Sequence, residues 1–130
     1  MRASRVTVAL SVALASSVAR AAVLECSVTR KLDTENTYSR EYLEKAKFTV
    51  LVEESASVAK LSRCSFVQSK RSVTCDSYDV DRVEYDANIG AKKFYVFRSQ
   101  LDVQVFRDLT FVENNGRGGI AFGTCHVKSL

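Results

Sequence analysis

A regular alternation of apolar and polar residues runs through much of the chain and limits the folds open to it. Within 101–105, Leu101, Val103 and Val105 alternate with two polar residues. Side chains two positions apart point to the same face of a β-strand, so this pattern predicts a strand with one buried face. Similar runs recur, separated by turn-forming residues, at 47–54, 92–98 and 119–127. The spacing predicts an all-β domain, a small antiparallel barrel or sandwich of about eight strands.

Two segments depart from simple alternation. In 92–98 both faces are apolar, which predicts a central strand that is covered on both sides. In 78–86, Val80 and Val83 lie three residues apart rather than two or four. This spacing predicts a β-bulge near Asp81, because one extra residue would return both valines to the same face.

The connections between the alternating runs contain turn-forming residues. Hairpin turns are expected at 68–72 and 86–90. The segment 33–46 is polar and lacks alternation, and Tyr38, Tyr42 and Ala46 recur in it at four-residue spacing. A short helix capped by Asp33 or Thr34 fits this segment, and so does a polar loop.

The first 21 residues have the layout of a secretory signal peptide. Arg2 and Arg5 precede an apolar run at 6–18, and Ala19 and Ala21 provide the small residues that signal peptidase requires. The apolar run is shorter than the roughly 20 residues that a membrane-spanning helix needs. We therefore predict cleavage after Ala21, no transmembrane segment after cleavage, and a periplasmic or secreted protein.

Cleavage would leave a single disulfide-linked β-domain at 22–130 and would change the charge balance. The chain contains 19 Lys and Arg residues and 15 Asp and Glu residues, and three of the basic residues lie in the leader. The mature part therefore has 16 basic and 15 acidic residues. Nucleic acid binding requires a basic excess on one face, so we expect no nucleic acid partner.

All four cysteines lie in the predicted mature domain. An even number of cysteines in a short exported chain indicates disulfides. Cys64 and Cys75 flank a predicted hairpin, and Cys26 and Cys125 lie in the first and last strands. We therefore predict the pairs Cys64–Cys75 and Cys26–Cys125, which would stabilise the domain by about 3 and 4–5 kcal/mol through loop closure.

Four of the five glycines lie within eight residues, from Gly116 to Gly123. A phosphate-binding loop is one reading, but 116–121 lacks the following helix and the later acidic residue that a dinucleotide site needs. The structural reading assigns Gly116 to a turn. The small residues Gly119, Ala121, Gly123 and Cys125 then share one face of the last strand and form a stripe that lets another backbone or a ring approach closely.

The same region contains the candidate recognition tip. The pair Asn115-Gly116 favours a type I′ hairpin turn, because both central positions of that turn need positive φ. Together, Asn114, Asn115 and Arg117 form a candidate tip in which the arginine meets a carboxylate or phosphate of a partner. The alternative is a structural arginine, either solvated or paired with Glu113.

Catalytic chemistry has few candidate residues in this sequence. His126 is the only histidine, and its neighbour Cys125 is assigned to a disulfide. The acidic residues at 79–86 alternate in a way that is typical of a solvated strand face, rather than of a glycosidase carboxylate pair. We expect no enzymatic activity, no cofactor and no metal site.

Three stretches of the second half, DRVEYD, KKFYVFRSQ and FVENNGRGGIAFGTC, resemble a group of small exported bacterial all-β proteins of unknown function. The last stretch is the most specific of the three. The resemblance implies export and a compact β-fold, and it implies no catalytic residue.

The function expected from these features is an exported, non-enzymatic binding or interaction domain, a monomer whose partner is a protein or a small ligand. One alternative is a periplasmic inhibitor of a cell-wall hydrolase. The other is a lipocalin-like carrier with an enclosed cavity of roughly 300 Å³ or more. The aromatic residues that would line such a cavity are Phe94, Tyr95, Phe97, Phe106, Phe111 and Phe122.

Overall fold

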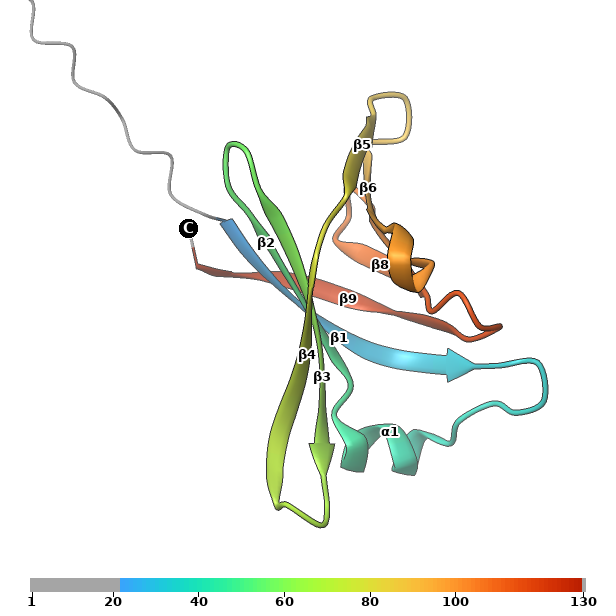
Figure 1. The fold of residues 1–130 in the computed structure, drawn as a ribbon. Helices are drawn as coiled ribbons and strands as arrows, with labels where there is room; N and C mark the ends of the chain where they lie inside the picture. Colours follow the sequence, from blue (N-terminus) through green and yellow to red (C-terminus); the bar gives the residue numbers. More distant parts are fainter. Residues whose placement is uncertain (1–21, 130) are drawn as a thin grey trace, which may run out of the picture.

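The computed structural model describes residues 22–129, and the predicted signal peptide at 1–21 lies outside them. Nine antiparallel strands form one sheet in the order β4-β3-β2-β1-β9-β8-β7-β6-β5. The sheet curls into a half-barrel (Figure 1), which confirms the all-β, barrel-like prediction with one more strand than expected. The elements are β1 (Ala22–Leu32), α1 (Arg40–Ala46), β2 (Thr49–Glu54), β3 (Ala59–Val67), β4 (Ser72–Asp79), β5 (Arg82–Asp86), β6 (Ala91–Val96), η1 (Phe97–Ser99), β7 (Leu101–Val105), β8 (Thr110–Asn114) and β9 (Ile120–Ser129).

The first and last strands lie side by side in the middle of the sheet, and the consecutive strands β4 and β5 form its two edges. The chain passes from one edge to the other through Val80 and Asp81. Their N–H groups donate to the carbonyls of Ala59 (3.0 Å) and Tyr95 (2.8 Å), which belong to β3 and β6. The predicted β-bulge at this point is wrong, because β4 ends and β5 begins here, and this break accounts for the irregular valine spacing.

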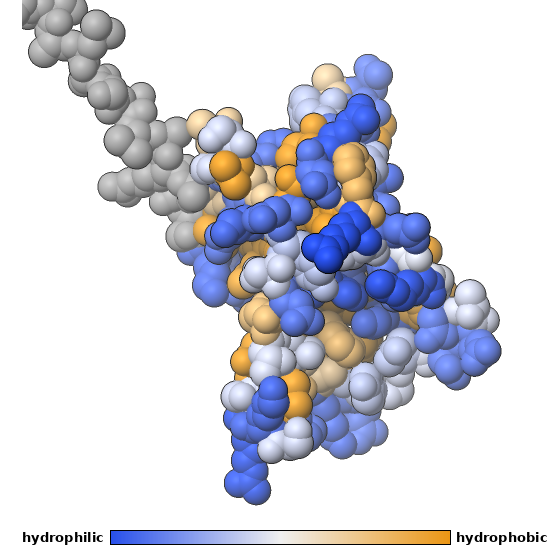
Figure 2. Space-filling view, in the orientation of Figure 1, coloured by the Kyte–Doolittle hydropathy of each residue, from blue (hydrophilic) through white to orange (hydrophobic). Residues whose placement is uncertain are grey.

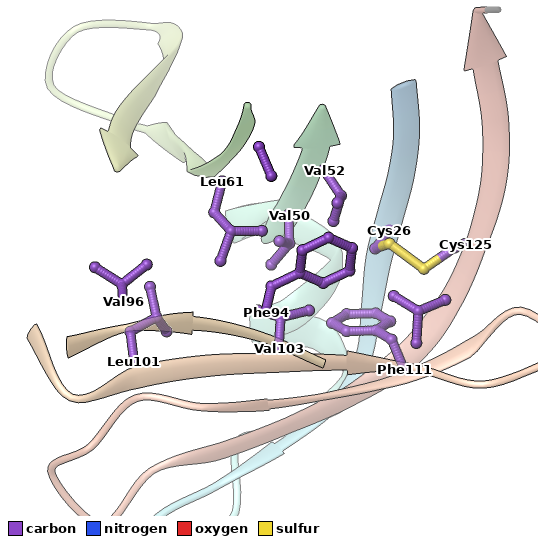
Figure 3. Packing of buried hydrophobic residues seen from close by; sticks show 12 residues of the cluster. Cys26, Val50, Val52, Leu61, Phe94, Val96, Leu101, Val103, Phe111 and Cys125 are labelled. Carbon is purple, nitrogen blue, oxygen red and sulfur yellow. A yellow bond between two sulfur atoms is a disulfide. The ribbon is translucent and has the colours of Figure 1, made fainter. Parts of the chain in front are cut away.

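The hydrophobic core lies on the concave face of the half-barrel (Figure 3). Phe94 and Phe111 fill its centre, with exposed fractions of 2% and 1%. Leu101, Val103 and Val105 are buried there, as their alternation predicted. Each fully buried side chain of this size contributes about 1.5–3 kcal/mol through the hydrophobic effect. The remaining buried members are Cys26, Val50, Val52, Ala59, Leu61, Val96 and Cys125.

Strand β6 is covered on one face only and lies next to the edge, so its predicted central position is wrong. Phe94 and Val96 face the core. Tyr95 lies on the opposite face of the strand, where its hydroxyl donates a hydrogen bond to Glu84 at 2.9 Å. The polar end of the tyrosine is therefore satisfied on a face that is only partly buried. The strand ends at Val96, and Phe97 lies in η1 with 59% of its surface exposed.

Both disulfides have the predicted pairing. The Cys26–Cys125 bond joins β1 to β9 inside the core (Figure 3), and the Cys64–Cys75 bond joins β3 to β4. In each case the two cysteines lie directly opposite one another in neighbouring strands. Adjacent opposite positions place the sulfur atoms within bonding distance, so the strand register determines the pairing.

The polar segment 33–46 contains a helix, but only over its last seven residues. Ser39 caps α1, since its Oγ accepts a hydrogen bond from the backbone N–H of Tyr42 at 3.1 Å. The predicted caps, Asp33 and Thr34, lie too early. The Asp33 carboxylate instead accepts hydrogen bonds from two backbone N–H groups of the turn that precedes the helix. A carboxylate that bonds the N–H groups two and three residues ahead stabilises a turn.

Candidate functional site

The predicted recognition tip is the connection between β8 and β9, and its backbone is held by two asparagine side chains. Asn115 Oδ1 accepts hydrogen bonds from the N–H groups of Arg117 (2.7 Å) and Gly119 (2.9 Å). Asn114 Oδ1 accepts one from the N–H of Gly116 (2.9 Å). The structure therefore brings the three predicted tip residues together, with the asparagines supporting the loop that presents the arginine.

The predicted type I′ turn is wrong. Positive φ occurs at Gly116 (75°) and Gly118 (85°), and Asn115 is outside this region, whereas a type I′ turn needs positive φ at two adjacent positions. The backbone N–H of Asn115 donates to the carbonyl of Gly119 at 3.0 Å, which leaves a loop of three residues. This loop is one residue longer than the two-residue type I′ turn, and the asparagine side chains accept hydrogen bonds from the N–H groups of its backbone.

Glycine at position 123 has the role that the stripe of small residues predicted. A Cβ atom at this position would collide with the carbonyl oxygen of Ser27 in β1 and would lie 2.7 Å from a ring carbon of Phe111. Gly123 therefore lets the β1 backbone and the central aromatic ring of the core approach the last strand. The glycine-rich stretch is explained by folding, with the exception of Arg117.

Arg117 is exposed and makes no ion pair with any residue of 22–129. The alternative in which it pairs with Glu113 is wrong, because the Glu113 carboxylate binds Arg63 instead. Arg63 Nε donates to one carboxylate oxygen at 3.2 Å and Nη2 donates to the other at 3.1 Å. Glu113 is 4% exposed, so this is a largely buried pair that links β8 to β3 across the concave face.

A second cation, Lys31, lies close to this ion pair on the concave face. Its Nζ atom is 4.0 Å from the ring centroid of Phe48 and 5.4 Å from that of Tyr38. Burial lowers the pKa of Lys31 below its ordinary value of 10.5, although the Glu113 carboxylate acts in the opposite direction. Burial by itself would lower the pKa of Arg63 as well. The charge and hydrogen bonds of Glu113 outweigh burial, so the pKa of Arg63 lies above its ordinary value.

These charged groups surround a pocket of about 170 Å³ at one end of the concave face. Lys31 and Arg63 are half-buried at its walls, and Asp76 is exposed at its rim. Its other lining residues are Val28, Phe48, Thr49, Val50, Cys64, Ser65 and Glu113. None of the charged residues of this pocket was predicted from the sequence to be a site residue. A usable signal was present in 59–65 and 111–113, where Arg63 and Glu113 occupy positions that continue an inward-facing apolar stripe.

A different pocket, of about 220 Å³, lies at the opposite end of the concave face. An ion pair between Glu54 and Lys92 joins β2 to β6 there. Of the six aromatic residues predicted to line a carrier cavity, only Phe94 and Phe106 reach this pocket.

Figure 2 shows hydrophobic side chains among hydrophilic ones on the part of the molecule that holds β5 and β6, where Tyr85 is 64% exposed.

The other residues considered as catalytic or metal-binding candidates lie apart from one another. His126 is exposed on β9, 3.9 Å from a carboxylate oxygen of Glu25. Asp81 accepts a hydrogen bond from the N–H of Phe97, and Glu84 binds Arg82. Within 22–129 no three metal-ligating side chains gather into a cluster. No helix in this range is long and apolar enough to span a bilayer.

Comparison of the chain with models of protein families, with curated proteins and with solved structures finds no match.

Proposed function

We propose that the protein is an exported, non-enzymatic binding domain that recognises an acidic group of a protein partner through the β8–β9 tip. The observation behind this proposal is the exposed guanidinium of Arg117 on a loop whose backbone is fixed by Asn114 and Asn115. Arginine binds carboxylates through two parallel hydrogen bonds. A fixed loop loses little conformational entropy on binding, which favours affinity.

Two further observations support this assignment. Two disulfides in a small domain indicate an oxidising compartment, in agreement with the predicted leader. The centre of the half-barrel is filled by Phe94 and Phe111, which favours recognition at the surface over a ligand carried in the core. The proposed location is therefore the periplasm or the extracellular medium.

Inhibition of a cell-wall hydrolase is a second candidate function, and the shape of the tip favours it. Arg117 is flanked by Gly116 and Gly118, so it carries the only side chain of the three-residue loop. A narrow cationic loop is suited to enter the cleft of a glycoside hydrolase, where two carboxylates flank the scissile bond.

The test is affinity capture with the oxidised domain 22–130 from an extract of exported bacterial proteins, followed by titration of the purified partner. Arg117→Ala should weaken binding by about 1–3 kcal/mol, which is the loss of a charge-assisted interaction. Arg117→Lys should restore part of the affinity, since the ammonium keeps the charge but lacks the planar fork. Lys70→Ala, which removes a cation from the β3–β4 hairpin tip, is the control and should bind like the unmodified domain. Unchanged affinity of Arg117→Ala would rule out the tip as the recognition site.

A further inference from the structure

We propose that the pocket between β1, β3 and β8 binds a small monocarboxylate, which is held by Lys31 beside the Arg63–Glu113 ion pair. This site is separate from the β8–β9 tip, and the proposal does not depend on the function assigned to that tip.

The first step is the balance of charges. Arg63 donates a hydrogen bond to each oxygen of Glu113, whereas Lys31 is attracted to Glu113 and Asp33 by charge without a direct contact to either carboxylate. Lys31 makes no ion pair with a carboxylate of residues 22–129. Its ammonium instead packs on the ring of Phe48, which satisfies none of its three N–H donors fully. A half-buried ammonium with free donors favours an anion as its partner.

The second step is size. The pocket volume is about 170 Å³, and a water molecule occupies about 30 Å³ in the liquid. The pocket therefore has room for a ligand of a few non-hydrogen atoms, and it is too small for a nucleotide or a lipid chain.

The third step is the chemistry of the walls. Val28, Phe48 and Val50 form an apolar side, and Ser65 adds a hydroxyl donor near the cations. This combination suits a carboxylate with a short apolar tail. The carboxylates of Glu113 and of Asp76 at the rim oppose a second negative charge on the ligand, so a monoanion should bind better than sulfate or phosphate.

The experiment is a titration of the oxidised domain 22–130 with sodium propionate at constant ionic strength, followed by the NMR shifts of backbone amides. We expect saturable shifts in β1, β3 and β8, and much weaker ones with sodium sulfate. Lys31→Met should reduce the affinity at least tenfold, which is the low end for losing a charge-assisted hydrogen bond. Asp76→Asn should raise the affinity several-fold, because it removes a repelling charge.

Two controls separate a specific site from general electrostatics. Arg30→Met removes the same charge from the neighbouring position of β1, where Arg30 is exposed over the ring of Phe122 on the convex face, and should leave the affinity unchanged. Arg117→Ala should also bind propionate normally, so a failure of the tip proposal leaves this one intact. Circular dichroism of Lys31→Met checks folding, and Lys31→Gln provides a second variant with a polar side chain.

The source of the carboxylate is distinguished by a peptide pair. A tetrapeptide with a free carboxyl end that binds more tightly than propionate, and whose amidated form does not bind, identifies the carboxyl end of a protein chain. Binding of propionate alone identifies a free acid. Linear, non-saturable shifts, or equal losses in Lys31→Met and Arg30→Met, would overturn the proposed site.

Discussion

Replacing Glu113 by Gln should destabilise the domain by about 3 kcal/mol. The Glu113 side chain is 5% exposed and receives two hydrogen bonds from Arg63. Glutamine keeps the shape and removes the charge, so the half-buried Arg63 loses the carboxylate that it binds, and Lys31 loses a nearby negative charge. Removing one partner of a buried ion pair costs about 3–5 kcal/mol. Because Arg63 is 30% exposed, water can solvate its guanidinium, and we expect the lower end of that range.

Urea unfolding of the oxidised domain 22–130, followed by far-ultraviolet circular dichroism, measures this loss. For a domain of this size, about 3 kcal/mol corresponds to a fall in Tm of about 12 °C. Glu44→Gln breaks the exposed helical pair with Arg40 and should cost less than about 0.5 kcal/mol. The double variant Arg63→Met/Glu113→Leu should recover more than half of the loss, because it leaves neither charge of the pair behind. A loss below about 1 kcal/mol in Glu113→Gln would refute the reasoning, since it would show that the pair behaves as a surface ion pair.

Two further predictions concern the core and the charged pocket. Gly123→Ala should cost about 2 kcal/mol or more, because its Cβ would overlap the backbone of β1 and crowd Phe111; an unchanged Tm would contradict the close approach described for this strand. The pKa of Lys31 is lower in the folded domain than its ordinary value of 10.5 in the unfolded chain. Between the folded and the unfolded pKa the unfolded chain therefore binds more protons, so the contribution of Lys31 to stability should rise with pH in this window. Urea unfolding at a series of alkaline pH values should show this rise relative to Lys31→Met, which lacks the Lys31 ammonium and keeps every other titrating group.

Features that depend on a short stretch of chain were predictable from the sequence. The pleat of a β-strand imposes the period of two, so the burial of Leu101, Val103 and Val105 follows from their spacing alone. The cysteine pairs could also be assigned, because Cys64 and Cys75 flank one hairpin and the remaining two, although 99 residues apart, lie in the first and last strands. The need for small residues near Gly123 was also visible, because a run of such residues in a strand indicates close contact with a neighbour.

Features that depend on competition among nearby polar groups were only partly predictable. A short helix or a polar loop was expected within 33–46, and Ser39, Asp33 and Thr34 are all suitable helix caps by residue type. Asp33 bonds the turn before the helix, and this leaves Ser39 as the cap. In the same way, Asn115 bonds the loop with its side chain, so the Asn-Gly pair does not form the expected tight turn.

The charged pocket is decided by the tertiary structure. Arg63 and Glu113 are 50 residues apart in the chain and belong to strands that are not neighbours in the sheet. An inward-facing charge in a strand signals that a buried partner exists, but the alternation does not say which of the remaining charged residues it is. The curl of the nine-stranded sheet brings β3 opposite β8, and only this curvature places Lys31, Arg63 and Glu113 around one pocket. Strand periodicity is a local property of the backbone, whereas the curvature results from the packing of the whole concave face.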